Sequence, residues 1–97
     1  MTRRRNALDI LKDILEICLN TGQVKSQIMY KANLSFRQLE MHLGICVERG
    51  LLKKQINGSR VVYITTEKGV EFLEAHDKIM SFVKARAQNK MVKKDES

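Results

Sequence analysis

The last third of this 97-residue sequence carries a single helical pattern. Thr66 can cap the start of a helix, and Glu67 and Glu71 follow in the first turns, where acidic side chains favour the positive helix end. A helix from 67 to beyond 90 would have about 25 residues and a length of ~38 Å, so it would project beyond a body of roughly 65 residues. Its apolar stripe then needs a partner, and a second copy of the same helix is the simplest one.

The stripe of this predicted helix has the spacing of a coiled coil. Intervals of three and four residues alternate through Leu73, His76, Met80, Val83 and Ala87. Acidic residues lie at the start of the helix and basic residues between 78 and 94. This polarity complements the helix dipole, which explains part of it, and it also suits antiparallel pairing, which would place each acidic start beside a basic end. We therefore expect a homodimer through an antiparallel coiled coil, with an interface formed by Phe72, Leu73, His76, Ile79, Met80, Val83 and Ala87.

Three shorter helices are expected before it. The first spans roughly 6 to 20, is capped by Asn6, and carries a helically spaced apolar set: Leu8, Leu11, Ile14, Leu15, Cys18 and Leu19. The second is short and capped by Ser26. The third spans about 36 to 49 and ends at Gly50, with one apolar face formed by Phe36, Leu39, Leu43, Cys46 and Val47.

Two local signals connect and extend these helices. In the turn Asn33-Leu34-Ser35, we expect Asn33 in the left-handed region, Leu34 buried, and Ser35 as the cap of the third helix. Residues 53–56 and 60–64 read as strands around Asn57-Gly58-Ser59, a strong hairpin signal. Gln23 to Lys25 is too short for more than a bridge or a short strand. The pattern predicts a mainly α (α+β) fold: a winged helix-turn-helix over 1–66 and a dimerisation helix with a tail over 67–97.

Charge narrows the choice of partners. Lys and Arg number 18 against 11 Asp and Glu, a net charge of +7 that favours nucleic acid or an anionic membrane. No apolar run reaches the ~20 residues of a bilayer span, and the basic N-terminus lacks the apolar region of a signal peptide. We therefore expect a cytoplasmic, nucleoid-associated protein.

Neither cysteine nor histidine forms a chemical motif. Cys18 and Cys46 have no CxxC and no nearby His pair, so we expect buried thiols and no metal or other cofactor, with a disulfide between the two left open. His42 and His76 are the only histidines, and no nucleophile, base and orienting group converge in the sequence. The five glycines are scattered along the sequence rather than gathered in a phosphate loop. We do not expect an enzyme.

The stretch from Ile28 to Leu52, IMYKANLSFRQLEMHLGICVERGLL, resembles the helix-turn-helix of archaeal winged-helix regulators. With the hairpin, the Thr66-Glu67-Lys68-Gly69 segment and the long last helix, about residues 6 to 92 resemble the ten-kilodalton DNA-binding proteins of Sulfolobus. That resemblance implies two winged-helix domains placed on double-stranded DNA by an antiparallel coiled coil. Thr65 departs from it, because such proteins more often have an aliphatic residue there, so the last strand is expected to be shifted or more exposed.

The third helix is the expected recognition helix. Its residues facing away from the apolar side, or at the margins of that side, are Ser35, Arg37, Gln38, Met41 and His42. Arg37 can read guanine and Gln38 adenine through paired hydrogen bonds, and Ser35 can donate to a phosphate. The competing interpretation is an ordinary solvated helix face.

Two further basic segments are candidate DNA contacts. The hairpin would be the wing and would contact phosphates or a minor groove through Lys53, Lys54, Asn57, Ser59 and Arg60. The N-terminal arm offers Arg3, Arg4 and Arg5. The wing lysines have an alternative role in protecting an exposed strand edge, and the arm resembles any disordered terminus.

The sequence thus predicts a double-stranded DNA binder that acts as a transcriptional regulator or a chromatin protein. The main alternative is a winged-helix protein-interaction module without nucleic acid, and a weaker one is membrane-surface binding by the basic end of the last helix. The target sequence, any effector ligand, and the choice between regulator and chromatin protein are not determined by these residues.

Overall fold

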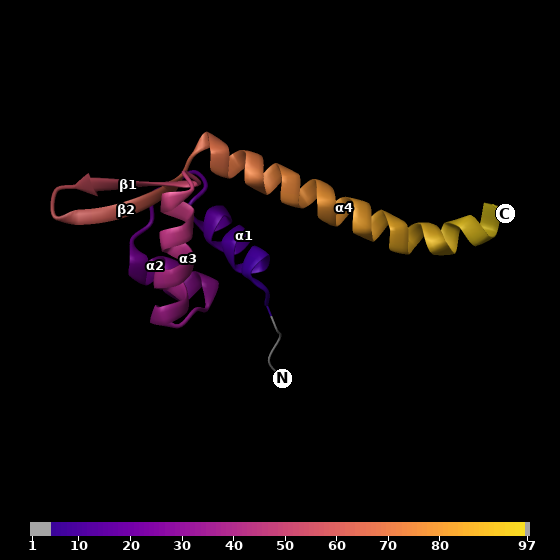
Figure 1. Ribbon diagram of the computed structural model, residues 1–97, viewed down its shortest axis with the longest axis horizontal. Coiled ribbons are helices and arrows are strands. Elements are labelled where there is room, and N and C mark those ends of the chain that lie inside the picture. The colour runs from indigo at the N-terminus through magenta and orange to yellow at the C-terminus, as the bar shows by residue number, and fades with distance from the viewer. Residues whose placement is uncertain (1–4, 97) are drawn as a thin grey trace.

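The computed structural model describes the backbone of residues 5–96 and the side chains of residues 5–84. The elements follow in the order α1 (Ala7–Ile17), α2 (Lys25–Ala32), α3 (Phe36–Glu48), β1 (Leu52–Asn57), β2 (Arg60–Thr65) and α4 (Glu67–Glu96). The first three helices form the body, the β1–β2 hairpin projects to one side, and α4 extends away on the other (Figure 1). This is the predicted winged helix-turn-helix with a two-stranded wing and a long C-terminal helix.

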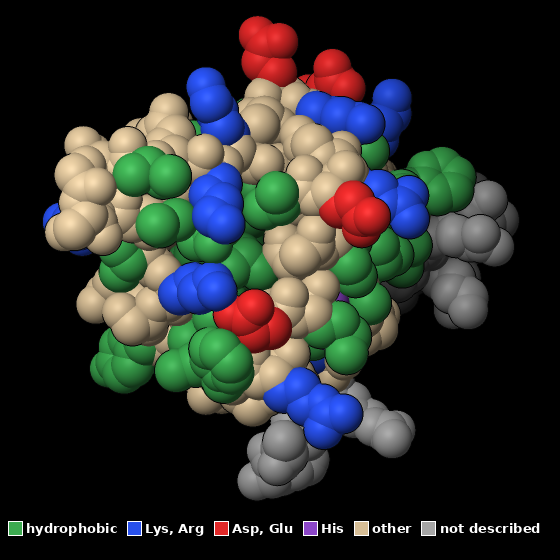
Figure 2. Space-filling view, turned by 60° about the vertical axis from the view of Figure 1, so that its left-hand side comes forward, with side chains coloured by type: hydrophobic (Ala, Val, Ile, Leu, Met, Phe, Trp, Pro, Cys, Tyr) green, Lys and Arg blue, Asp and Glu red, His purple; other side chains and the backbone are tan. Residues whose placement is uncertain are grey.

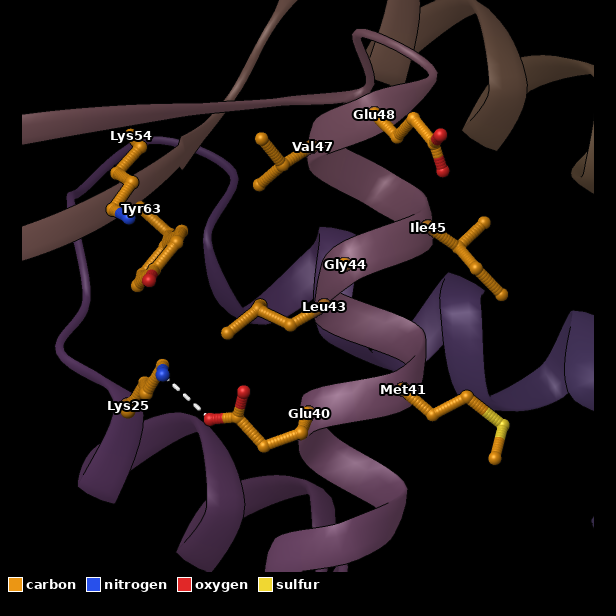
Figure 3. Close-up of a pocket in the computed structure, with 10 residues that line it drawn as sticks. All are labelled: Lys25, Glu40, Met41, Leu43, Gly44, Ile45, Val47, Glu48, Lys54 and Tyr63. Carbon is orange, nitrogen blue, oxygen red and sulfur yellow. Dashed lines mark hydrogen bonds and ion pairs between the residues drawn. The ribbon is translucent and has the colours of Figure 1, made fainter.

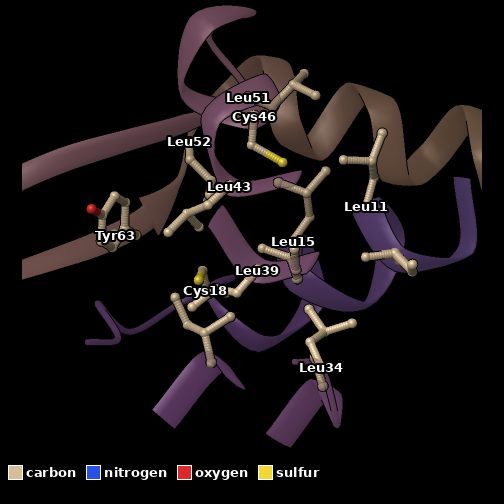
Figure 4. Packing of buried hydrophobic residues seen from close by; sticks show 14 of the residues in the cluster. Leu11, Leu15, Cys18, Leu34, Leu39, Leu43, Cys46, Leu51, Leu52 and Tyr63 are labelled. Atoms are coloured by element: carbon tan, nitrogen blue, oxygen red, sulfur yellow. The ribbon is translucent and has the colours of Figure 1, made fainter. Parts of the chain in front are cut away.

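One apolar core holds the body together. Its side chains come from every element, including α4, and the most deeply buried are Ile14, Leu15, Cys18, Ile28, Leu39 and Cys46 (Figure 4). Helix α1 supplies one continuous stripe, because Ile10, Ile14 and Leu11, Leu15 are each four residues apart and share a face. The core fixes α3 against α1 and α2, and so determines which face of α3 points outward.

The predicted helix-turn-helix signals are confirmed. The Asn6 side chain accepts from the Asp9 amide at 2.9 Å and caps α1. Asn33 adopts the left-handed region, with φ 57° and ψ 54°, and Leu34 is 8% exposed. Ser35 caps α3, so the sharp turn between α2 and α3 is encoded by adjacent residues through local backbone bonds.

Two details of the first helices differ from the expectation. The predicted cap Ser26 lies inside α2, which begins at Lys25 after Val24, a residue without a side-chain cap bond. Leu8 is 53% exposed, while Ile10 is buried in its place. Leu8 lies in the first turn of α1, where the other helices no longer cover the stripe; sequence spacing alone does not reveal where that cover ends.

Strand β1 extends one residue beyond the predicted range 53–56 at both ends. Strand β2 begins at Arg60, as predicted, and extends one residue beyond 64. Its register runs from Leu52 opposite Thr65 to Asn57 opposite Arg60. Asn57 therefore ends β1, and the two-residue turn is Gly58-Ser59, with positive φ (68°) at Gly58 only. Glycine at the first central position is the pattern of a type II′ turn. The expected short bridge is present between Gln23 and Tyr63.

Thr65 does not shift the register of β2. Its hydroxyl donates to the Leu15 carbonyl at 2.7 Å, and its amide donates to the Cys18 carbonyl at 3.0 Å. The Leu15 carbonyl belongs to the last turn of α1, where carbonyls lack helical partners. Thr65 therefore supplies the bond that an aliphatic residue would leave unmade.

The first turns of α4 belong to the body. Thr66 accepts from the Gly69 amide at 3.1 Å, which confirms the predicted cap, and Leu73 is 8% exposed within the core. The expectation that Leu73 faces a partner helix is wrong, because α1 and the hairpin base already cover this end of α4. Among the described residues, no helix has the length and apolar character needed to cross a membrane.

Candidate nucleic-acid interface

Helix α3 has a buried inner face that includes one unexpected residue. His42 is 8% exposed, three residues after Leu39 and four before Cys46, so it lies on the inner face. Its Nδ1 donates to the Gln38 carbonyl at 2.8 Å, since a carbonyl can only accept. His42 was expected to face away from the apolar side of α3 or to lie at its margin, and the structure instead buries it on the inner face.

Phe36 shows the opposite difference. It was expected on the core face, yet it is 62% exposed at the first position of α3. The first buried residue of α3 is Leu39, about one turn after Phe36, so Phe36 lies outside the packed body. An aromatic side chain is thereby presented beside Arg37 at the start of the candidate recognition helix.

The N-terminus of α3 is closed by a capping box. Ser35 Oγ accepts from the Gln38 amide at 3.1 Å, and Gln38 Oε1 accepts from the Ser35 amide at 3.0 Å. The Ser35 hydroxyl hydrogen is left available for a phosphate oxygen. Reading adenine through paired bonds would require the Gln38 oxygen, which is engaged in the box.

The outer face of α3 follows a straight line of residues. Arg37, Met41, Gly44 and Glu48 are separated by four, three and four residues, and all are exposed. Figure 3 shows Gly44 at the centre of this face, with Met41 pointing to one side and Glu40 and Val47 to the side of the wing. Arg37 is the one basic side chain on this line.

The wing presents all five predicted residues to solvent: Lys53, Lys54, Asn57, Ser59 and Arg60. The register places Lys54 opposite Tyr63, on the strand face that borders α3, whereas Lys53 and the Asn57–Arg60 pair lie on the other face. Ile56, which the sequence analysis did not single out, is 76% exposed next to the turn. Leu52, Lys54 and Ile56 are alternate residues of β1, so the sequence spacing already indicated that Ile56 shares a strand face with Lys54.

A groove of about 490 Å³ separates α3 from the wing. The Lys25 ammonium bonds the Glu40 carboxylate across it and ties the start of α2 to α3 (Figure 3). This hydrogen bond raises the pKa of Lys25 above its ordinary value. Lys54 and the buried Tyr63 complete the wall on the wing side.

One of the three arginines of the predicted N-terminal arm is bonded to other residues of the chain. Arg3 and Arg4 lie outside the described residues. Arg5 donates to the Ala32 carbonyl and to the Asp13 carboxylate, both at 2.8 Å. It therefore links the end of α2 to α1, a bonded position that differs from the free basic arm we expected.

Basic side chains are spread over the wing side of the molecule rather than gathered in one block. Figure 2 shows Lys and Arg interspersed with apolar side chains on this face, and fewer acidic ones. Such a surface combines positive charge with apolar contact area.

Both thiols are buried and free. Cys18 and Cys46 are each 0% exposed and form no disulfide, in agreement with the expected buried thiols. Burial raises the pKa of each thiol to about 12. They serve as core residues behind α3 rather than as reactive groups.

A helix pair joined by a tight turn, with the outer face of its second helix exposed beside a two-stranded wing, defines a winged helix-turn-helix module. The family model described as winged helix-turn-helix matches residues 4–84. The chain belongs to this family.

Individual relatives agree with the family. An uncharacterised protein of Methanocaldococcus jannaschii is 31% identical over 51 residues, which are 53% of each protein, so the chain spans about half the length of this curated relative. Sso10a-2, a DNA-binding protein from Sulfolobus solfataricus, has a TM-score of 0.71 and 25% identity, over 94% of this chain and 92% of that one. The resemblance to Sulfolobus DNA-binding proteins is confirmed.

The fold also matches that of MepR from S. aureus, solved as a complex with DNA. The TM-score is 0.68 at 16% identity, over 90% of this chain and 73% of that chain. At this level of identity the likeness concerns the fold.

Proposed function

We propose that this protein binds double-stranded DNA as a homodimer, with α3 in the major groove and the wing on the flanking backbone. The observation that carries the proposal is the exposed Arg37 in the first turn of α3, beside a wing whose five polar and basic residues are all exposed. The N-terminal end of a recognition helix reaches base edges first. Related DNA-binding proteins share the fold, and the net charge of +7 suits a polyanion.

The proposed contacts divide into base reading and positioning. Arg37 reads a guanine through two parallel hydrogen bonds, while the Ser35 hydroxyl donates to a phosphate. Lys53, Lys54 and Arg60 neutralise phosphates along the wing. Gln38 keeps the cap of α3, and His42 contributes packing, so neither contacts a base in this proposal.

Dimerisation through α4 is the second part of the proposal. Beyond Leu73 the helix leaves the body and exposes Ile79 (60%), Met80 (39%) and Val83 (52%) along one stripe, with Phe82 (69%) beside it. Exposed apolar residues at this spacing favour pairing with an identical helix. Phe72 packs against the chain's own core, and the side chain of Ala87 lies outside the described residues.

Fluorescence anisotropy with a labelled mixed-sequence duplex, at several salt concentrations, tests the DNA proposal. The logarithm of the affinity should fall linearly with that of the salt concentration, with a slope of about 0.9 per neutralised phosphate.

Arg37→Ala should cost ~1–3 kcal/mol of binding free energy on selected sites and relax specificity at one position. Lys12→Ala, in α1 and outside the proposed DNA contacts, removes the same charge as a control. Absence of binding by the wild type at low salt would reject the proposal in favour of a protein-interaction module.

Selection from random duplexes then separates the two biological roles. A regulator returns a consensus with two half-sites, whereas a chromatin protein returns a weak composition bias. In either role the protein would reside on chromosomal DNA in the cytoplasm.

A further inference from the structure

The outer face of α3 contains few polar groups able to read bases. Gln38 is engaged in the capping box and His42 is buried. Glu40 is bonded to Lys25, and Glu48 carries the same sign of charge as DNA. Arg37 is therefore the one outer-face side chain suited to paired bonds with a base, and the centre of the face consists of Met41 and Gly44.

Nothing in the described part of the chain requires glycine at position 44. It lies in the interior of α3, where glycine costs roughly 0.5–1 kcal/mol relative to alanine. A Cβ built at Gly44 meets nothing within 4 Å, whereas one built at Gly69 would lie 2.4 Å from the Leu51 carbonyl oxygen. A glycine that its own fold does not require is suited to the close approach of another molecule to the helix backbone.

Met41 stands next to this bare position. It is 56% exposed, three residues before Gly44 and four after Arg37, and its side chain points outward on the side of α3 away from the wing (Figure 3). Met41 and Gly44 are consecutive on the outer line of α3, and the next charged group on that line, Glu48, is a full turn beyond Gly44. An unbranched apolar side chain in this place can adapt to a methyl group at the groove floor.

We propose that Met41 and Gly44 read thymine: the bare backbone at Gly44 admits DNA close to α3, and Met41 contacts a thymine C5-methyl group. This inference rests on the proposed DNA binding and specifies what the recognition helix reads. In the major groove the C5-methyl is the apolar mark of an A·T pair. Four residues of helix span ~6 Å, about two base-pair steps, so the thymine lies within about two pairs of the guanine read by Arg37.

Replacing thymine by deoxyuridine tests the contact with Met41. The two duplexes have the same charge and pairing and differ only in the methyl group. The wild type should bind the thymine duplex about fourfold more tightly for each contacted thymine, the factor equivalent to ~0.8 kcal/mol for one buried methylene-sized group. Met41→Ala should abolish the preference, and Met41→Leu should retain most of it. Equal binding of both duplexes by the wild type, or a preference that survives in Met41→Ala, overturns the proposal.

Gly44→Ala tests the close approach. The added methyl meets no atom within 4 Å among the described residues, so the variant should be more stable than the wild type by thermal unfolding and yet bind DNA several-fold more weakly. A more stable variant with unchanged affinity contradicts the role of Gly44, and loss of folding contradicts the open surroundings of its Cβ.

The outcomes distinguish this inference from the function on which it rests. If the wild type binds no duplex at low salt, the proposed DNA binding fails and the reading of thymine fails with it. If the wild type binds with a steep salt dependence but ignores the thymine methyl, DNA binding stands and only the role of Met41 is lost.

Discussion

At the scale of single residues, the polar groups that matter most for this fold bridge segments far apart in sequence. The Thr65 hydroxyl reaches the Leu15 carbonyl fifty positions away, and Arg5 spans from α1 to the end of α2. The Leu15 and Ala32 carbonyls lie in the last turns of α1 and α2, where carbonyls lack helical partners, and the Asp13 carboxylate gains an ion pair. These residues position α3 indirectly, because α1 and the end of α2 form the surface on which it packs.

Thr65→Val should destabilise the protein by ~1–3 kcal/mol. Valine has nearly the same shape, so the loss comes from the Leu15 carbonyl, which is left without its donor in a buried place. Urea unfolding followed by circular dichroism measures the change in unfolding free energy. Thr65→Ser, which keeps the hydroxyl, should lose less; equal stability of Thr65→Val and the wild type would contradict the account of this position.

The two cysteine thiols should be unreactive in the native protein. Burial raises the pKa of Cys18 and Cys46 from 9.0 to about 12, so almost no thiolate exists near neutral pH. A thiol-specific chromogenic reagent should therefore label both only after denaturation. Because the unfolded thiols ionise first, the folded state should also lose stability as the pH rises from about 9 toward 12. Rapid native labelling would contradict this prediction.

At the scale of elements, the junction between β2 and α4 fixes the direction in which the long helix leaves the body. Thr66 caps α4, and its hydroxyl also lies 2.6 Å from the Gly50 carbonyl at the end of α3. Gly69 lets the helix pass directly over the Leu51 carbonyl. The proposed recognition helix α3 and the proposed dimer helix α4 are thereby connected through one compact contact.

Gly69→Ala should destabilise the protein, in contrast to Gly44→Ala. Its Cβ would lie 2.4 Å from the Leu51 oxygen and 2.5 Å from Thr65 Cγ2, so a backbone or a packed side chain must move. Overpacking of this kind costs ~1–3 kcal/mol, more than the helix propensity gained from alanine. Thermal unfolding of the two alanine variants side by side provides the measurement, and an increase in stability for both would refute the distinction.

At the scale of the whole molecule, the proposed dimer predicts a change in mass and in DNA binding together. Ile79→Glu combined with Val83→Glu places charges in the exposed stripe of α4 and should yield a folded monomer by sedimentation velocity. DNA affinity should then fall, because two half-sites are no longer bound as one unit. Ser81→Glu, exposed on the opposite side of the helix, is the matched control. A dimer that persists in the double variant would place the interface elsewhere.

Short-range features of this protein were readable from the sequence because neighbouring residues create them. Asn6, Ser35 and Thr66 cap helices through bonds to amides three residues on, and the left-handed Asn33 needs only its own backbone. Periodicity likewise predicted the helices, the hairpin and the long α4. The helix α3 and the hairpin on which the candidate site is proposed were therefore predicted correctly as elements.

Only the tertiary structure decided which side chains on those elements are free. Helical spacing shows that a face is apolar but not where its cover ends, so Phe36 proved exposed, and His42 and Leu73 proved buried. Arg5 is bonded because the Ala32 carbonyl of α2 lies within its reach. The Gln38 side chain is bonded in the capping box of α3, which occupies the oxygen that base reading would need. Local bonds and periodicity belong to the sequence, whereas exposure is a property of the packed neighbours, which come together only in the fold.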